Sequence, residues 1–124
     1  MKQRIKKYLA IGIISIFIMS VSIVHCDEGK LTPLPLNRPN SLGFIYQAKV
    51  GTETIPVPFA LFLPKDYEVD KTRRFPMILF LHGGGEGGTD LASIFIHGPH
   101  AVVYNIPGML PNFPFIVCSP QSTR

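Results

Sequence analysis

The chain has 124 residues, two cysteines and a formal net charge of +4, which leaves room for one small domain at most. Four of its twelve Lys and Arg residues lie within the first seven positions, so the remaining eight are balanced by eight Asp and Glu residues. A balanced chain lacks the basic surface that nucleic-acid binding requires, and we expect no nucleic-acid partner. No Cys and His spacing is typical of a zinc site, so no metal is expected.

Residues 1–26 have the order of a secretory signal peptide. Lys and Arg come first, and an uncharged segment rich in Ile, Leu and Phe follows at 8–24. A cleavage site at 24–26 predicts export, to a secreted or periplasmic location. The alternative is a membrane anchor, because the apolar run is close to the lower limit of ~17 residues for a spanning helix. The chain would then meet a membrane only through this leader.

Residues 27–42 are rich in Pro, Asn and Thr and read as an extended linker without a helix or strand pattern. Two predicted strands follow, at 43–50 and 55–63, and a short turn between them makes a hairpin. Pro56 and Pro58 in the second strand favour an edge position or an irregular start.

Residues 64–74 carry seven charged side chains. We interpret them as a solvated surface loop. An anion site at Arg73 and Arg74 is the less favoured alternative.

The stretch that organises the chain begins at 75–81, which is apolar at every position. Such a run is typical of a strand buried on both faces of a parallel sheet. His82 and a cluster of glycines follow at once, which indicates a sharp turn and a close approach to the main chain. Thr89 or Asp90 can then cap a helix.

That helix has an apolar face at 91–95 and is interrupted before Pro99, which can start a second helical piece. Residues 105–112 hold two prolines and a glycine and read as a loop. The last predicted strand, at 114–119, contains Cys118, which we expect to be a buried small hydrophobe.

This order of elements predicts an α/β fold with a sheet that is parallel in its later part. About four strands and one helical region are too few for the usual covered parallel sheet. We therefore expect an incomplete sheet, the beginning of a larger domain.

Three chemistries compete for the glycine cluster. Gly83-x-Gly85-x-x-Gly88 fits a dinucleotide-binding fingerprint, but that site needs an acidic residue ~20 positions later and none follows Asp90. A phosphate-binding P-loop needs Lys where Thr89 stands. The third is an oxyanion hole, in which backbone N–H groups stabilise the negative charge that develops on a carbonyl oxygen during acyl transfer.

Four motifs follow one another along the chain: Leu63-Pro64-Lys65-Asp66-Tyr67, the strand and turn at 75–86, His97-Gly98-Pro99, and the strand and its end at 113–121. In this series the chain resembles the α/β-hydrolase superfamily. More narrowly, it is similar to the secreted esterase group related to polyhydroxybutyrate depolymerases, feruloyl esterases and prolyl-oligopeptidase-like hydrolases. The resemblance implies that residues 43–124 are the N-terminal part of an α/β-hydrolase domain.

That resemblance implies a serine hydrolase of small-molecule or polymeric carboxylic esters, with no cofactor. The backbone N–H of Gly84 is the implied oxyanion donor, Gly85 is the runner-up, and His82 supports the turn. The nucleophile of such enzymes lies on a later G-x-S-x-G elbow, and its acid and His partners follow it; this chain contains no such pattern. His97 and His100 are expected to have no nucleophile beside them.

We expect Glu86 to be a turn residue and Asp90 a helix cap. Two classes of function stay open. One is a serine esterase of which this chain holds the oxyanion loop but not the triad. The other is a catalytically inactive fragment or a non-enzymatic secreted protein; a peptidase-like member of the superfamily is a further alternative.

Overall fold

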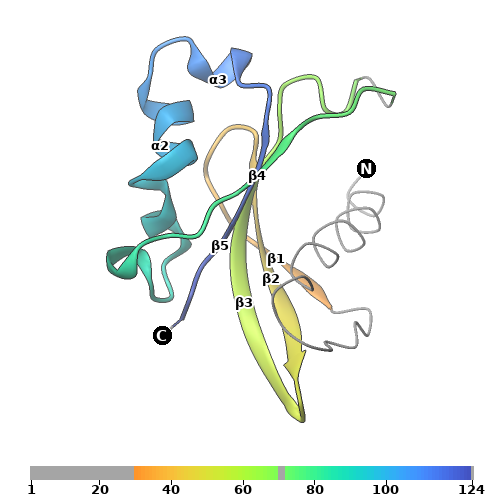
Figure 1. The fold of residues 1–124 in the computed structure, drawn as a ribbon, viewed down its shortest axis with the longest axis vertical. Coiled ribbons are helices and arrows are strands. Elements are labelled where there is room, and N and C mark those ends of the chain that lie inside the picture. The colour runs from red at the N-terminus through yellow and green to blue at the C-terminus, as the bar shows by residue number, and fades with distance from the viewer. Residues whose placement is uncertain (1–29, 70–71, 124) are drawn as a thin grey trace.

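A computed structural model describes residues 30–69 and 72–123 (Figure 1). The expectations for residues 1–26 lie outside this part of the chain. Five strands form one mixed sheet in the order β1-β2-β3-β5-β4. They are β1 (Leu31–Leu34), β2 (Ser41–Val50), β3 (Glu53–Phe62), β4 (Met77–Leu79) and β5 (Ile116–Pro120). Within the described ranges, no helix has both the length and the apolar character needed to cross a membrane.

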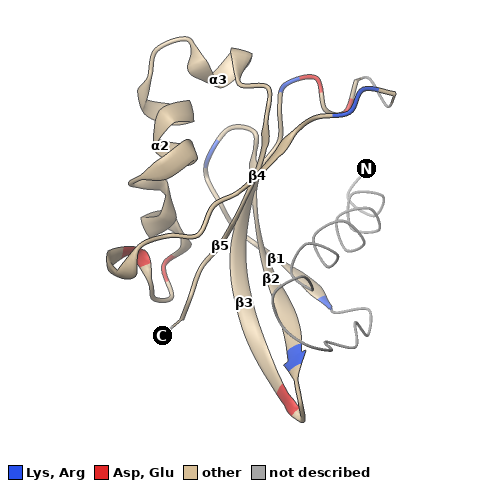
Figure 2. Cartoon of the chain, in the orientation of Figure 1, with Lys and Arg blue, Asp and Glu red and all other residues tan. Residues whose placement is uncertain are grey.

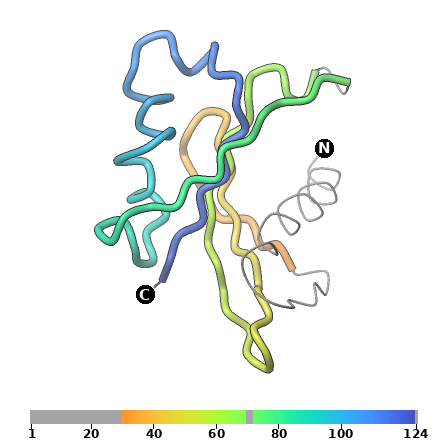
Figure 3. Tube along the Cα trace, viewed as in Figure 1, coloured from red at the N-terminus to blue at the C-terminus, as the bar shows by residue number. Residues whose placement is uncertain are grey.

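Strands β2 and β3 form the predicted hairpin, which projects from the sheet as a long arm in Figures 1 and 3. Phe44 pairs with Phe59 across the two strands, and their rings stack with centroids 5.5 Å apart. The edge position suggested by Pro56 and Pro58 is wrong for β3 as a whole, because β5 lies on its other side. However, β5 pairs only with Phe59–Phe62, so both prolines lie beyond the ladder with β5, and the Gln121 N–H reaches the Pro58 carbonyl oxygen, which proline retains.

The segment predicted as a linker contributes a strand. Strand β1 pairs antiparallel with β2, and Leu31 lies opposite Tyr46. The prediction that residues 27–42 form a linker without a strand is therefore wrong at Leu31–Leu34. The prolines of this segment made it look like a linker. They are compatible with an edge strand, because such a strand needs ladder hydrogen bonds on one side only.

Strand β5 is antiparallel to β3 and parallel to β4, as expected for a sheet that becomes parallel in its later part. The strand predicted at 75–81 is shorter, since β4 spans only Met77–Leu79. It is also an edge strand in the described sheet, and the Met77 and Leu79 residues are 36% and 37% exposed. The expectation of burial on both faces is therefore wrong in this structure.

The helical elements follow β4 in the chain. They are the 3₁₀ helices η2 (Gly84–Glu86) and η3 (Leu91–Phe95) and the α-helices α2 (Gly98–Asn105) and α3 (Met109–Asn112). The helix break before Pro99 is confirmed, with Pro99 in the first turn of α2. Short α3 forms where a loop was predicted, and Figure 1 shows α2 and α3 on the same side of the sheet.

Alternate residues of β3 pack on opposite faces of the sheet. Phe59 and Leu61 join one cluster, whereas Phe62 packs on the helix side with Val103 of α2. Phe62 is fully buried, which contributes about 1.5–3 kcal/mol relative to exposure. Cys118 is a free thiol and 2% exposed, so the expectation that it is a buried small hydrophobe is confirmed; burial raises its pKa to about 12.

The described part of the charged loop is a solvated surface, as predicted. Arg73 and Asp66 lie 3.8 Å apart with both side chains about half exposed. Figure 2 shows these charges gathered away from α2 and α3, which carry none. The two acidic residues of the glycine segment, Glu86 and Asp90, are the last charges before the final residue of the chain.

Candidate functional site

The glycine segment leaves the sheet at the carboxyl end of β4. Directly after β4, the Phe80 N–H still donates a backbone hydrogen bond to the Cys118 carbonyl oxygen of β5 at 2.9 Å. Because β4 and β5 are parallel, the turn after β4 and the segment after β5 emerge at the same edge. In open α/β sheets, this carboxyl edge is where ligands bind.

Gly83 is the N-cap of η2, with extended backbone (φ −77°, ψ 173°), and Gly84 and Gly85 are its first two residues. The first N–H groups of a helix have no acceptor within that helix. Both glycines are exposed, and a Cβ added at either would meet nothing within 4 Å. The turn therefore has open space around both glycines, and their N–H groups have no acceptor within η2.

His82 holds the turn against the segment after β5. Its Nδ1 lies 2.6 Å from the Gly83 carbonyl oxygen, and its Nε2 accepts a hydrogen bond from the Ser122 N–H at 2.8 Å. A ring that donates from Nδ1 and accepts at Nε2 is the neutral tautomer. Both ring nitrogens are engaged in backbone contacts.

Glu86 is the buried acid of the turn. One carboxylate oxygen, Oε2, accepts from the Gly83 N–H at 2.6 Å, which is half of a capping box. The other, Oε1, lies 2.5 Å from His97 Nδ1. The hydrogen bond from His97 is the main cause that lowers the pKa of Glu86; burial opposes it, and the Gly83 N–H adds to the lowering. The carboxylate is therefore ionised at neutral pH.

The backbone of Glu86 is tied to the end of β5. Its carbonyl oxygen accepts from Gln121 Nε2 and from Ser93 Oγ, both at 2.8 Å. Gln121 is 2% exposed, and Nε2 also lies 2.8 Å from the Asp90 carbonyl oxygen. Sequence reasoning gave Gln121 and Ser93 no role, because a neutral polar residue carries no pattern that predicts its partner.

Asp90 caps η3, as predicted. Its Oδ1 accepts from the Ala92 N–H at 2.9 Å. Glu86 lies at a turn as expected, but its link to His97 across eleven residues was not foreseen.

His100 was expected to have no nucleophile beside it, but a buried hydroxyl lies there. His100 Nε2 lies 2.8 Å from Ser119 Oγ, which joins α2 to β5. Both residues have no exposed surface, and His100 Nδ1 has no partner within the described residues. Burial lowers the pKa of His100 to about 4, so the ring is neutral at pH 7. The pair is sealed in the core, and no carboxylate within the described ranges orients it.

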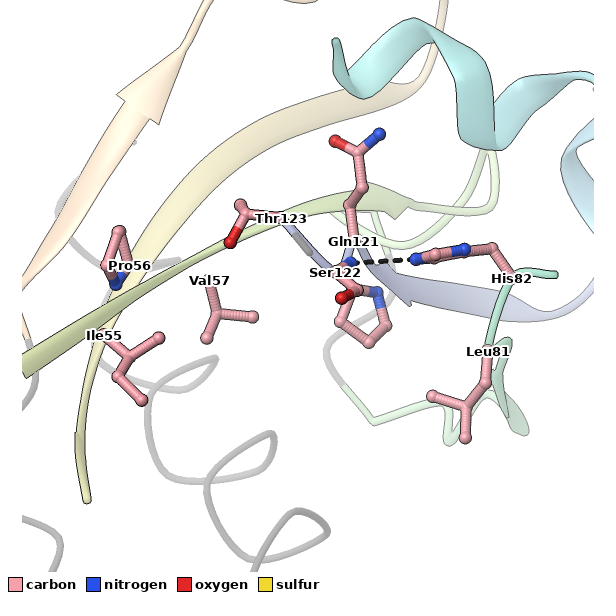
Figure 4. Close-up of a pocket in the computed structure, with 9 residues that line it drawn as sticks. Ile55, Pro56, Val57, Leu81, His82, Gln121, Ser122 and Thr123 are labelled. Atoms are coloured by element: carbon pink, nitrogen blue, oxygen red, sulfur yellow. Dashed lines mark hydrogen bonds between the residues drawn. The ribbon is translucent and has the colours of Figure 1, made fainter. Parts of the chain in front are cut away.

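Two open pockets adjoin the turn. One, of about 490 Å³, has Gly83, Gly85, Glu86 and His97 among its lining residues. The other, of about 430 Å³, lies between the start of β3 and the end of β5; Figure 4 shows His82 and Ser122 on one side of it and Val57 on the other. No group of three or more His, Cys, Asp or Glu side chains in the described ranges could hold a metal ion.

No family model and no curated protein matches the chain. Among solved structures, it is similar to one described as the crystal structure of a thermostable esterase, with 34% sequence identity and a TM-score of 0.52. The match covers 67% of this chain and 21% of that chain. The described fold is esterase-like. It corresponds to about a fifth of the length of that esterase.

Proposed function

We propose that the chain carries the oxyanion-hole segment of a serine hydrolase that acts on carboxylic esters. The Gly84 N–H is the first donor, Gly85 is the runner-up, and His82 supports the turn through its two backbone contacts. One observation carries the proposal: two exposed donors begin η2 at the carboxyl edge of an esterase-like sheet.

The chemistry follows from charge. Attack on an ester places negative charge on the former carbonyl oxygen, and fixed N–H donors 2.7–3.1 Å from that position stabilise it. Glycine suits these positions because no side chain blocks the substrate, and space is open at both Gly84 and Gly85.

The proposal includes no nucleophile among the described residues. Ser119 is sealed against His100, and both nitrogens of His82 are occupied. The proposal therefore places the nucleophile and its partners outside this sequence, on the G-x-S-x-G elbow and the segments after it. The proposed substrate is a small-molecule or polymeric ester, and export through residues 1–26 is part of the proposal.

The proposal is tested by extending the reading frame downstream and assaying the chain and the extended protein on a chromogenic short-acyl ester. We expect G-x-S-x-G within the next ~50 residues, after the next strand, and serine-dependent turnover in the extended protein only. Serine-dependent turnover by the 124-residue chain would contradict the absence of a triad. Inactivity of an extended protein that contains the elbow would favour the alternative, a non-catalytic product.

A further inference from the structure

Three consecutive glycines separate His82 from Glu86, and they cannot hold their own geometry. Gly84 and Gly85 have no side chain, and nothing packs within 4 Å of where one would begin. Glycine also has the largest backbone freedom to lose on folding. Donors useful to an oxyanion must nevertheless keep one direction, because their benefit depends on being oriented before the reaction.

The backbone of Glu86 is an anchored end of the turn. Its carbonyl oxygen accepts from Gln121 Nε2 and Ser93 Oγ, so its main chain is tied to the sheet and to η3. The side-chain carboxylate of this anchored residue accepts a hydrogen bond from the Gly83 N–H at 2.6 Å. The two glycines between are therefore closed into a short loop with both ends anchored.

His97 completes the arrangement from the other side. A carboxylate that is mostly buried needs a partner for each oxygen, and His97 Nδ1 occupies the Oε1 side. His97 is the N-cap of α2, and the next residue, Gly98, lies so close to the Phe80 ring that a Cβ there would approach it to 2.4 Å. The histidine is therefore held at a packed helix start.

We propose that Glu86 is the positioning residue of the glycine turn, with its carboxylate linking Gly83 to His97 and so fixing the direction of the Gly84 and Gly85 N–H groups. Its value for catalysis rests on the oxyanion role proposed above, but the link can be measured without any turnover. A merely structural acid would affect the melting temperature and leave these two amides unchanged relative to the rest of the chain.

The test is backbone ¹⁵N relaxation on the isotope-labelled full chain in a neutral detergent. In the unaltered protein we expect rigid order parameters, about 0.85, at Gly83–Gly85 and a downfield Gly83 amide proton, because charge-assisted hydrogen bonds are short and strong. In Glu86→Ala, the order parameters of Gly84 and Gly85 should fall below about 0.6 and the Gly83 shift should be lost.

Three further variants separate this link from general stability. Glu86→Gln can still accept from Gly83 and should retain part of the order. His97→Ala alters a side chain that is 71% exposed, so folding is preserved, and the Gly83 amide should move upfield. Asp90→Ala removes an equal charge from the same segment but only the η3 cap, and should leave Gly83–Gly85 unchanged.

The outcomes distinguish the two proposals. Loosening in Glu86→Ala and an upfield Gly83 amide in His97→Ala support the link. The same result together with unchanged ester turnover when the Gly84 and Gly85 N–H groups are removed would support the link and overturn the oxyanion role. Rigid Gly84 and Gly85 amides in folded Glu86→Ala, or an unmoved Gly83 amide in His97→Ala, would overturn the link whatever the turnover.

Discussion

Ser119 Oγ lies 2.8 Å from His100 Nε2, and neither side chain has any exposed surface. A hydroxyl and an imidazole at this distance resemble part of a catalytic triad, but here the imidazole packs at a tilt against Phe95, with ring centroids 4.4 Å apart, and no carboxylate among the described residues completes the set. The pair links α2 to β5. Its measurable consequence is in stability rather than catalysis.

The folded state should lose stability in mild acid because of His100. Its pKa is lowered from 6.5 to about 4 by burial, so the unfolded chain binds this proton more readily. Stability is full above about pH 6.5 and falls by about 3 kcal/mol as the pH drops to about 4. Urea unfolding across this range measures the slope, and His100→Gln should flatten it. An equal slope in that variant would contradict the assignment to His100.

Glu86, whose pKa is lowered, contributes a further loss of folding stability only below about pH 4.5.

Gly98→Ala should destabilise the protein by about 2–5 kcal/mol, because φ is +65° there and the new methyl group would also meet the Phe80 ring at 2.4 Å. Gly108→Ala is the matched control: φ is also positive there, at 77°, but nothing lies within 4 Å. Thermal melts of the two variants separate overpacking from backbone strain, which alone costs roughly 1–2 kcal/mol at a left-handed position. A smaller loss of stability in Gly98→Ala than in Gly108→Ala would show that the start of α2 is not packed on Phe80.

The β4 edge should make the chain self-associate. Met77 and Leu79 are more than one third exposed on a strand that has β5 as its only partner in the described sheet. Leu79→Lys should reduce concentration-dependent association in sedimentation velocity. Val69→Lys, at an 80% exposed position in the charged loop, is the control and should leave it unchanged. Equal association in all three proteins would mean that another surface is responsible.

The order of elements could be predicted from the sequence because each rests on a local pattern. The β2–β3 hairpin follows from two apolar runs and a turn, and the Asp90 cap follows from an acidic residue before an apolar face. The apolar run into His82 located β4 but not its exposure, since a strand's neighbours are set by distant parts of the chain. Periodicity alone does not distinguish an edge strand from an interior one.

The candidate site was only half predictable. The glycines that present the donors can be read from the sequence, because glycine has a conformational signature. The contacts that hold these glycines in place cannot be read from the sequence. Glu86 meets His97 across eleven residues, and Gln121 reaches Glu86 across thirty-five. Such pairings depend on how α2 and β5 pack, and no local spacing encodes them.

The central claim is that the Gly84 N–H stabilises an oxyanion, and one pair of variants tests it in the extended, nucleophile-containing protein. Gly84 is the first residue of η2, where proline is tolerated, so Gly84→Pro removes the donor while Gly84→Ala keeps it in open space. We expect kcat on a short-acyl ester to fall about 10²–10³-fold in Gly84→Pro and to stay near the unaltered value in Gly84→Ala. An equal kcat in both variants would contradict the central claim.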